Sequence, residues 1–454
     1  MLEVAWSIAA FIVAIGVLIS FHEFGHFWVA RRLGVKVLRY SIGFGRALWQ
    51  KRGRDGVEYV IAALPLGGYV KMLDEREGDV PPEDLPRAFN RQKPWKRIAI
   101  VVAGPLANFL LAVVAYWVVY VAGVTAQKPI IDEPAPGTVA AVAGLHERDE
   151  IVALDGEALV TFQALRTELI ERALNGEAVQ LQVRAASGAT RQQPLPLAGV
   201  RVDPEFLFDD LGLHPYTPTG PLALVEVLPE TPAAQAGFAP GDRILSQNGE
   251  QIDNIQRWRD WIAARPGQLV EFDVQRGGAR VRLSAVLGAR ERDGRSVGYL
   301  GASVRVDVPP AVWENLTTEH RLSVWAAAPA AVVQTGRMSA LTLKMLYRMV
   351  LGDVSVKNVT GPIQIAQFAG YTASIGLVSF LSFIAIMSVS LAVLNLLPVP
   401  VLDGGHLLYY VVELVKGSPL SERAQAVGQQ LGLTLLIALM GLAFYNDILR
   451  LINN

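Results

Sequence analysis

Four long apolar stretches constrain the fold of this chain more than any other feature. Each lacks Asp, Glu, Lys and Arg, and each reaches the roughly 18–20 residues needed to cross the hydrocarbon core of a bilayer. They cover 4–21, 98–127, 371–402 and 424–446. Only 18% of all residues are charged, against about 25% in an average soluble domain. The sequence therefore predicts four transmembrane helices, with buried helices of a large soluble protein as the alternative.

The charges between these stretches predict the orientation. Segment 31–97 contains 15 Lys and Arg residues, which by the positive-inside tendency places it in the cytoplasm. Both termini and the long segment 128–370 then lie on the outer side. The first stretch is not a cleavable signal peptide, because basic residues follow it rather than precede it. A net charge of −1, without a basic stripe, argues against a nucleic-acid partner.

The outer segment contains a duplication. Residues 133–157 and 226–250 align at an offset of 93 with 11 identical positions in 25, which indicates a repeated domain. The run from Ala236 to Ile244, followed by Asn248-Gly249, resembles the PDZ domains of bacterial proteases, which bind peptide ends by strand addition. The first copy departs from that motif at His146-Glu147-Arg148, which leaves its peptide binding open. A spacer or size filter is the alternative for both copies.

The most specific chemical signal is His22-Glu23-Phe24-Gly25-His26 at the end of the first stretch. Residues four apart share one face of a helix, so two imidazoles so placed can bind one zinc ion. Zinc lowers the pKa of a bound water toward about 7 and polarises a carbonyl. Glu23 follows the first ligand directly, where its carboxylate can take a proton from that water. The alternative without a metal is that His22 and Glu23 are simply the polar residues at which the membrane span ends, in the headgroup zone.

A catalytic zinc needs a third protein ligand, and the chain has no cysteine to supply it. Asp403 and His406 both follow the third apolar stretch, which the predicted orientation brings to the same membrane face as His26. Two prolines and a glycine pair near Asp403 predict an interrupted helix, and an acid beside such a break indicates a functional site. Either residue remains a candidate from its position.

Four motifs together resemble the site-2 protease family of intramembrane metalloproteases. They are Phe21–His26, Gly104-Pro-Leu-Ala-Asn108, Asn395-Leu-Leu-Pro-Val-Pro400 and Leu402-Asp-Gly-Gly405. The resemblance implies that zinc is bound by His22, His26 and Asp403, with Glu23 as the base. It also implies that the substrate is held by Asn395, by a loop at Gly43-Phe44-Gly45, and by Pro398 and Pro400.

The same resemblance implies a substrate and a location. The expected substrate is a single-span membrane protein of the anti-sigma-factor type, already trimmed on its outer side, and the expected location is the bacterial inner membrane. The PDZ-like pair would then screen for the trimmed form. Two other classes are a non-catalytic membrane scaffold that gathers peptides, and a transporter, although no paired inverted repeats are seen.

The predicted fold is a multi-domain α+β membrane protein with a four-helix transmembrane core. Its expected parts are a first transmembrane helix at 1–30, a cytoplasmic β-rich membrane-associated segment at 31–97, a second helix at 98–126, PDZ-like domains at 127–218 and 219–307, an amphipathic linker region at 308–372, a third helix at 373–412 and a fourth at 424–449. Within the linker region, 321–350 is amphipathic and is expected either on the outer leaflet or in the core of that region.

Overall fold

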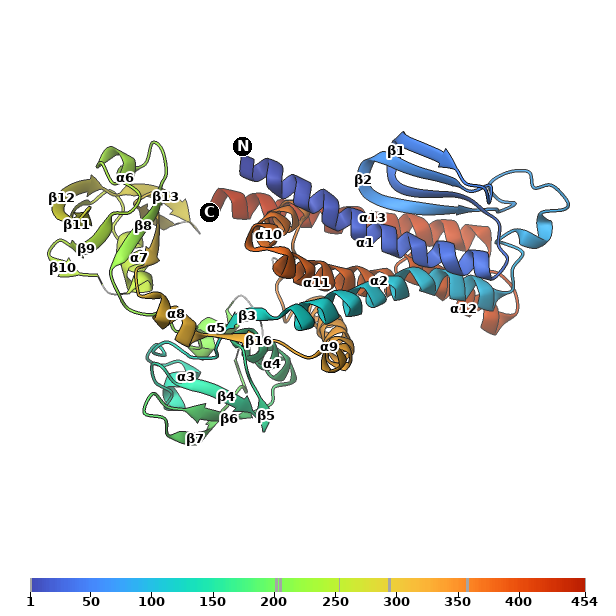
Figure 1. Ribbon diagram of the computed structural model, residues 1–454. Coiled ribbons are helices and arrows are strands. Elements are labelled where there is room, and N and C mark those ends of the chain that lie inside the picture. The colour runs from blue at the N-terminus through green and yellow to red at the C-terminus, as the bar shows by residue number, and fades with distance from the viewer. Residues whose placement is uncertain are drawn as a thin grey trace. The chain divides into compact units, whose positions relative to one another are not determined.

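The computed structural model describes residues 2–200, 203, 206–252, 254–292, 295–356 and 359–453. The chain forms two compact units (Figure 1). One unit combines Met1–Val124 with His320–Ile448, and the other contains Thr125–Glu319 and Leu449–Asn454. The first unit therefore brings together the two ends of the sequence, where the predicted transmembrane stretches lie.

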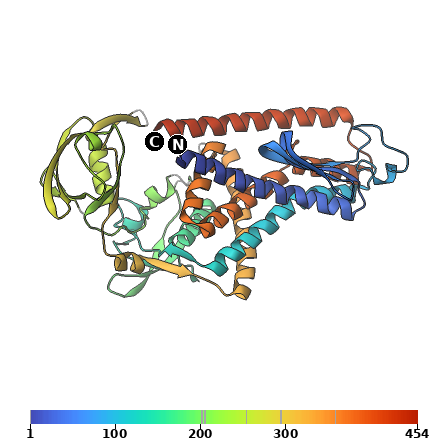
Figure 2. The same ribbon diagram turned by 45° about the horizontal axis from the view of Figure 1, so that its top comes forward.

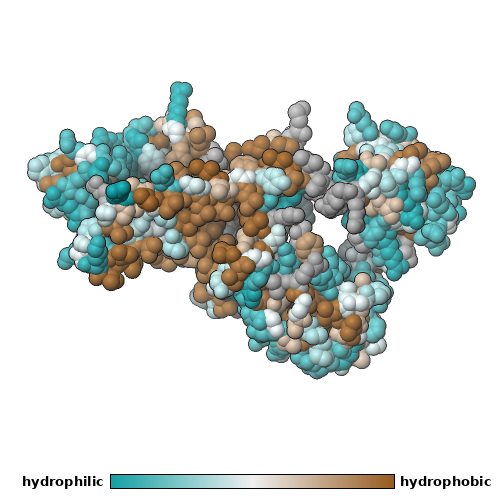
Figure 3. All heavy atoms as spheres, turned by 180° about the vertical axis from the view of Figure 1, so that it is seen from behind, coloured by the Kyte–Doolittle hydropathy of each residue, from teal (hydrophilic) through white to brown (hydrophobic). Residues whose placement is uncertain are grey.

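The first unit is mainly helical. Its helices are α1 (Leu2–Arg32), α2 (Pro94–Ala122), α9 (Val324–Leu351), α10 (Pro362–Ile375), α11 (Leu377–Leu396), α12 (Asp403–Lys416) and α13 (Glu422–Asn453), with the short η1 (Leu85–Arg87). Four spans are long and apolar enough to cross a membrane, namely Val4–Arg32, Pro94–Ala122, Leu377–Leu396 and Arg423–Leu451. Apolar side chains accordingly gather over these helices on the surface (Figure 3). The prediction of four such helices is confirmed.

The third predicted helix, expected over 373–412 with an interruption near Asp403, is divided at that point and also begins as a separate helix. Residues 362–375 form the separate helix α10, and α11 ends at Leu396. Pro398 and Pro400 cannot continue the helix because they lack an N–H donor. The turn that follows includes Val401 at φ +95°, a strained conformation for a β-branched residue. Asp403 consequently begins a separate helix, α12, rather than closing the transmembrane one.

Helix α2 lies at the centre of this unit, packed against α1, α9, α11 and α12. Small residues such as Ala112 and Ala115 are buried where it meets its neighbours, which lets the backbones approach closely. The amphipathic segment predicted over 321–350 is α9. Its small buried face, with Ala331, packs against α2 and α11, while Trp325 and Val350 on it are exposed. The helix is thus partly core and partly surface.

Strands β1 (Val37–Arg52) and β2 (Glu58–Met72) fold back on themselves into a sheet of four segments. Tyr40 pairs with both Val70 and Tyr59, so segment 37–42 lies between 68–72 and 58–61. Segment 58–62 pairs in turn with 47–52, which leaves 68–72 and 47–52 as the two edges. The sheet lies along α1 (Figure 2), and the Tyr40 hydroxyl donates to the Ser20 carbonyl at 2.8 Å.

The second unit contains two separate hydrophobic cores. The first surrounds a sheet of order β5-β4-β6-β7, and the second a sheet of order β12-β11-β9-β8-β15 with β10 beside β9. The strands and helices of the first half are β3 (Val124–Gln127), α3 (Val139–Val142), β4 (Glu150–Leu154), β5 (Glu157–Ala158), α4 (Phe162–Asn175), β6 (Val179–Arg184), β7 (Thr190–Leu195) and α5 (Leu207–Leu211).

The second half repeats this pattern and then extends it. Its elements are β8 (Leu222–Val227), α6 (Pro232–Gln235), β9 (Arg243–Gln247), β10 (Glu250–Gln251), α7 (Ile255–Ala263), β11 (Leu269–Arg276), β12 (Ala279–Val286), β13 (Gly288–Arg292), β14 (Arg295–Tyr299), β15 (Ala302–Val306), α8 (Pro310–Leu316) and β16 (Thr317–His320). Strand β16 pairs with β3, and β13 with β14.

A buried aspartate forms an ion pair with an arginine in both copies of the duplication. Asp149 is paired with Arg191 at 2.5 Å, and its counterpart Asp242 is paired with Arg276 at 2.6 Å. In each copy the arginine also donates to a glycine carbonyl, of Gly144 or Gly237. In both copies the pair ties the turn after a short helix to a sheet strand, but only the aspartate is at an equivalent position, because Arg191 lies on β7 and Arg276 on β11.

Candidate metal centre

Helix α1 packs closely on α2 around the two histidines, and this packing determines how far their side chains are buried. Gly25 on α1 faces the backbone of Ala103, and a Cβ at Gly25 would overlap the Ala103 carbonyl oxygen. Gly104 on α2 similarly faces the His26 ring, and a Cβ there would overlap Nε2. Because each helix presents a glycine to the other at this point, the backbones of α1 and α2 can approach closely.

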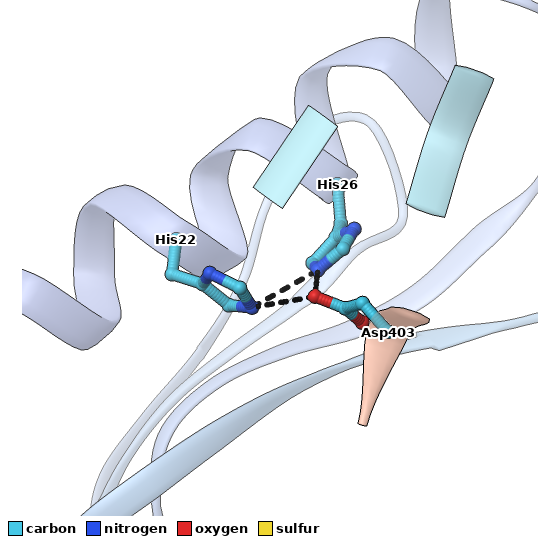
Figure 4. Close-up of side chains that lie close together, drawn as sticks. All are labelled: His22, His26 and Asp403. Atoms are coloured by element: carbon cyan, nitrogen blue, oxygen red, sulfur yellow. Dashed lines mark hydrogen bonds and ion pairs between the residues drawn. The ribbon is translucent and has the colours of Figure 1, made fainter. Parts of the chain in front are cut away.

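His22, His26 and Asp403 converge on one point (Figure 4). The two Nε2 atoms lie 3.2 Å apart, and Oδ2 of Asp403 lies 3.1 Å from that of His22 and 3.4 Å from that of His26. The two histidines are buried, with 9% and 8% of their surface exposed. Asp403 therefore lies close to both rings, as the predicted ligand set requires.

These three residues fit a zinc ion. Donors about 2.0–2.1 Å from one tetrahedral ion stand about 3.3 Å from one another, which is the spacing found here. Asp403 Oδ2 is buried and has no hydrogen-bond partner among the described residues. Such an atom is costly to bury unless it has a partner, and a metal ion would supply one. Two nitrogens and one oxygen are also a donor set that suits zinc.

Hydrogen bonds orient both imidazole rings. His26 Nδ1 lies 2.8 Å from the Ile100 carbonyl oxygen, so Nδ1 carries the proton and Nε2 offers its lone pair. On His22, Nδ1 lies 3.2 Å from Nδ2 of Asn108, whose Oδ1 has no partner among the described residues. Turning the Asn108 amide over would let Oδ1 accept the His22 Nδ1 proton, and amide orientation is assigned from just such networks.

The first turn of α12 positions Asp403. The helix is anchored at its other end by Glu413, which forms an ion pair with Arg97 on α2 at 2.5 Å, with both side chains largely buried. Gly405 packs against the backbone of Val399 and Pro400, where a Cβ would stand 2.5 Å from the Pro400 Cα. A carboxylate at a helix N-terminus is also favoured by the helix dipole.

Glu23 is buried beside the metal ligands and against the sheet. Gly68 at the edge of that sheet leaves room for it, because a Cβ at Gly68 would stand 2.8 Å from the Glu23 Cγ. The rival ligand His406 lies outside the cluster and instead packs against the rings of Tyr409 and Tyr410. The structure therefore brings Asp403, and not His406, to the histidine pair.

The remaining predicted site residues lie in two places. Asn395 is near the end of α11, and its side-chain amide makes no hydrogen bond to a described residue, while Pro398 and Pro400 form the turn that follows. Gly43 and Gly45 have φ of +94° and +84° and flank Phe44, whose ring stacks on Tyr69 at 6.1 Å. No described contact joins these residues to the metal ligands, so their roles stay predictions.

Three neighbours of the cluster were not predicted as site residues, namely Gly68, Gly104 and Asn108. Gly104 and Asn108 occur in one of the motifs that carry the family resemblance, but nothing in that motif specifies a contact, and Gly68 lies outside the four motifs. Gly104 and Asn108 are four apart on one apolar helix, so they share the face that α1 covers. That spacing was the signal available in the sequence.

Comparison with known proteins agrees with this geometry. Residues 10–439 match the family described as peptidase family M50. A Yersinia pestis protein named protease RseP is 42% identical over 457 residues, and an Escherichia coli K12 protein named regulator of sigma-E protease RseP is 40% identical over 455 residues. Each alignment covers 99% of this chain and 100% of the relative.

Two solved structures are each similar to part of this chain. The PDZ domain of an SdrC-like protein from Listeria monocytogenes is 22% identical, covers 20% of this chain and 93% of that domain, and has a TM-score of 0.17. The HtrA-type protease AlgW, solved with a decapeptide, is 18% identical and covers 32% of this chain and 55% of its own, also with a TM-score of 0.17.

A buried His–His–Asp cluster among helices that can cross a membrane defines a class, the membrane-embedded metalloproteases. This chain belongs to peptidase family M50. The predictions of the site-2 protease family and of a zinc metalloprotease are thereby confirmed.

Proposed function

We propose that His22, His26 and Asp403 hold the zinc ion of an intramembrane protease and that Glu23 is its general base. The convergence of three donor atoms on one point, among them a buried carboxylate oxygen that accepts no hydrogen bond from a described residue, carries this proposal. Zinc at this position supplies Lewis-acid polarisation of the scissile carbonyl and makes water more acidic. Glu23 takes the proton of the attacking water and delivers it to the leaving amine.

The sheet beside α1 offers a place for the unwound substrate. Segment 68–72 pairs on one side only with described strands, and its Gly68 lies against Glu23. A substrate helix must open before its peptide bonds can be cut, and an edge strand receives the freed N–H and C=O groups. The Gly43-Phe44-Gly45 turn supports that edge, and the Asn395 amide, with Pro398 and Pro400 after it, holds the substrate backbone or the developing oxyanion.

The substrate is a single-span membrane protein of the anti-sigma-factor type that has been trimmed on its outer side. Full-length likeness to proteins named regulator of sigma-E protease supports this choice. The 15 Lys and Arg residues of segment 31–97 support an orientation in the bacterial inner membrane with both termini periplasmic. The metal centre then lies near the cytoplasmic face.

The duplicated domains screen the substrate from the periplasmic side. A hollow of about 420 Å³ in the first copy, lined by Phe162, Gln163 and Arg166 of α4 and by His214, supports peptide binding there, although this copy departs from the PDZ motif. Deleting residues 128–305 is expected to release cleavage of untrimmed substrate. Unchanged selectivity for the trimmed form would refute the screening role.

Metal analysis and a cleavage assay test the catalytic proposal. The wild-type protein should retain about one zinc per chain, and His22→Ala should retain little. Glu23→Gln should keep the zinc and lose cleavage, because it removes the base without removing a ligand. A non-catalytic scaffold would instead bind no zinc, and Glu23→Gln would leave its biological output unchanged.

A further inference from the structure

A second hollow, separate from the metal centre, lies at the C-terminal end of α1. Its volume is about 880 Å³, and it is bordered by the end of α1, the start of β1 and the 52–58 turn of the sheet. Five basic side chains line it, namely Arg31, Lys36, Arg52, Arg54 and Arg87. Asp55 and Glu58 are its acidic residues, so the lining carries a formal charge of five minus two, or +3. A concave site with this charge selects an anion.

Two of the five basic side chains form no ion pair with a described carboxylate. The acidic residues of the lining already have partners, because Asp55 pairs with Arg31 at 2.5 Å and Glu58 pairs with Arg39. Lys36 is likewise paired, with Asp84. Arg52 and Arg54 form no ion pair with any described carboxylate, and Arg52 donates only to the Gly56 carbonyl. Two exposed guanidinium groups therefore remain for a ligand, and guanidinium binds phosphate oxygens in a bidentate manner.

The position of the hollow along α1 corresponds to the level of lipid phosphates. Trp28 is half exposed one turn before the hollow, and the Arg32 guanidinium lies 5.0 Å from the centre of its ring. Trp95, at the start of the antiparallel helix α2, is also half exposed and carries Lys96 over its ring. Exposed tryptophans with adjacent basic residues mark the headgroup interface of a membrane protein. The hollow begins just beyond these tryptophans and their basic neighbours.

We propose that this hollow binds the phosphate of an anionic phospholipid, with Arg52 and Arg54 as the principal contacts. The lipid's acyl chains lie along the exposed apolar face of α1, where Phe24 and Trp28 are each about half exposed. That face continues from the hollow into the membrane span, which favours a lipid over a soluble phosphate. Basic pockets at the cytoplasmic ends of transmembrane helices are a known way of recognising such headgroups.

Native mass spectrometry of the full chain tests the proposal in micelles that contain either phosphatidylglycerol or phosphatidylcholine. Wild type should retain phosphatidylglycerol in preference to phosphatidylcholine. Arg52→Ala/Arg54→Ala should lower phosphatidylglycerol affinity by about 30-fold. Lys51→Ala/Lys71→Ala removes the same charge from exposed positions outside the hollow and should keep the preference. Equal retention by both double variants would overturn the proposal.

Two further experiments distinguish a lipid phosphate from a soluble phosphate and test whether the variants fold. Inorganic phosphate at millimolar concentration should not displace phosphatidylglycerol or raise the melting temperature as the lipid does. If it matches the lipid in both respects, the site takes a soluble anion and the lipid assignment is wrong. Arg52→Lys/Arg54→Lys keeps the charge and should retain most of the lipid preference. Loss of preference in this charge-conserving pair as well, with unchanged melting, would contradict an electrostatic phosphate site.

Discussion

Gly104 on α2 leaves free the space that the His26 ring on α1 occupies, since any side chain at 104 would overlap His26 Nε2. A glycine at position 104 of α2 is therefore required for His26 of α1 to take its position as a proposed metal ligand. Gly104→Ala should force the imidazole away from Asp403 and sharply reduce bound zinc, as measured by elemental analysis of purified protein. Gly16→Ala, also in a membrane-spanning helix but with open space around it, is the control.

Asn108 should control zinc affinity without touching the ion. If its amide oxygen accepts the His22 Nδ1 proton, Asn108→Leu removes that acceptor and weakens zinc binding by about 10- to 100-fold. Asn108→Asp keeps an acceptor and should bind zinc closely to wild type. Chelator competition measures both. Ser388→Ala, which removes only a hydrogen bond to the Asn108 carbonyl, should leave affinity nearly unchanged. Wild-type affinity in the leucine variant would exclude the orienting role.

The Arg97–Glu413 pair should show strong coupling. Removing one partner leaves a buried charge without compensation, which costs about 3–5 kcal/mol. Arg97→Met alone should therefore lower the melting temperature and, by loosening α12, the zinc content. The double variant Arg97→Met/Glu413→Leu should recover most of the stability. Additive losses in the thermal melts would mean that the two side chains do not act as a pair.

The second duplicated domain should lose stability in acid. Burial raises the pKa of Asp242, but hydrogen bonds from Arg276 and the Ala239 N–H outweigh it and hold that pKa below its ordinary value of 3.8. Because the folded-state pKa is depressed, the stabilisation is complete above about pH 5 and is lost progressively as the pH falls below 3.8 and through the lower folded-state pKa.

Hydrogen exchange of residues in that domain, followed from pH 6 to pH 3 in the full chain, measures this loss. Asp242→Asn should cost about 1–3 kcal/mol at neutral pH and flatten the acid dependence. Glu250→Gln, an exposed change in the neighbouring strand β10, is the matched control. A variant at 242 that keeps the full acid sensitivity would show that other carboxylates cause it.

Local spacing predicts the chemistry of the first helix well. His22, Glu23 and His26 lie within two turns, so one helical period determines which face they share. Apolar run length predicted the four spans for the same reason, since each is a property of consecutive residues. Asp403 could be proposed from its place beside a helix break, but position alone did not separate it from His406; the family resemblance favoured it, and the fold brings it to the histidine pair.

Contacts between helices could not be predicted in this way. The fit of Gly104 against His26 and the approach of Asn108 to His22 depend on how α1 crosses α2, which no single segment encodes. The division of the third helix was underestimated because proline was expected only to interrupt it. The turn from Leu397 to Leu402 instead separates α11 from α12 entirely, which gives Asp403 its own helix.

The three proposed metal ligands come from opposite ends of the chain, with both duplicated domains encoded between them. During synthesis, the histidines enter the membrane long before the carboxylate has been translated. A nascent chain, or one truncated before α12, accordingly cannot hydrolyse its neighbours in the lipid. The order of the residues along the chain thus makes the proposed ligand set complete only once α12 has been synthesised.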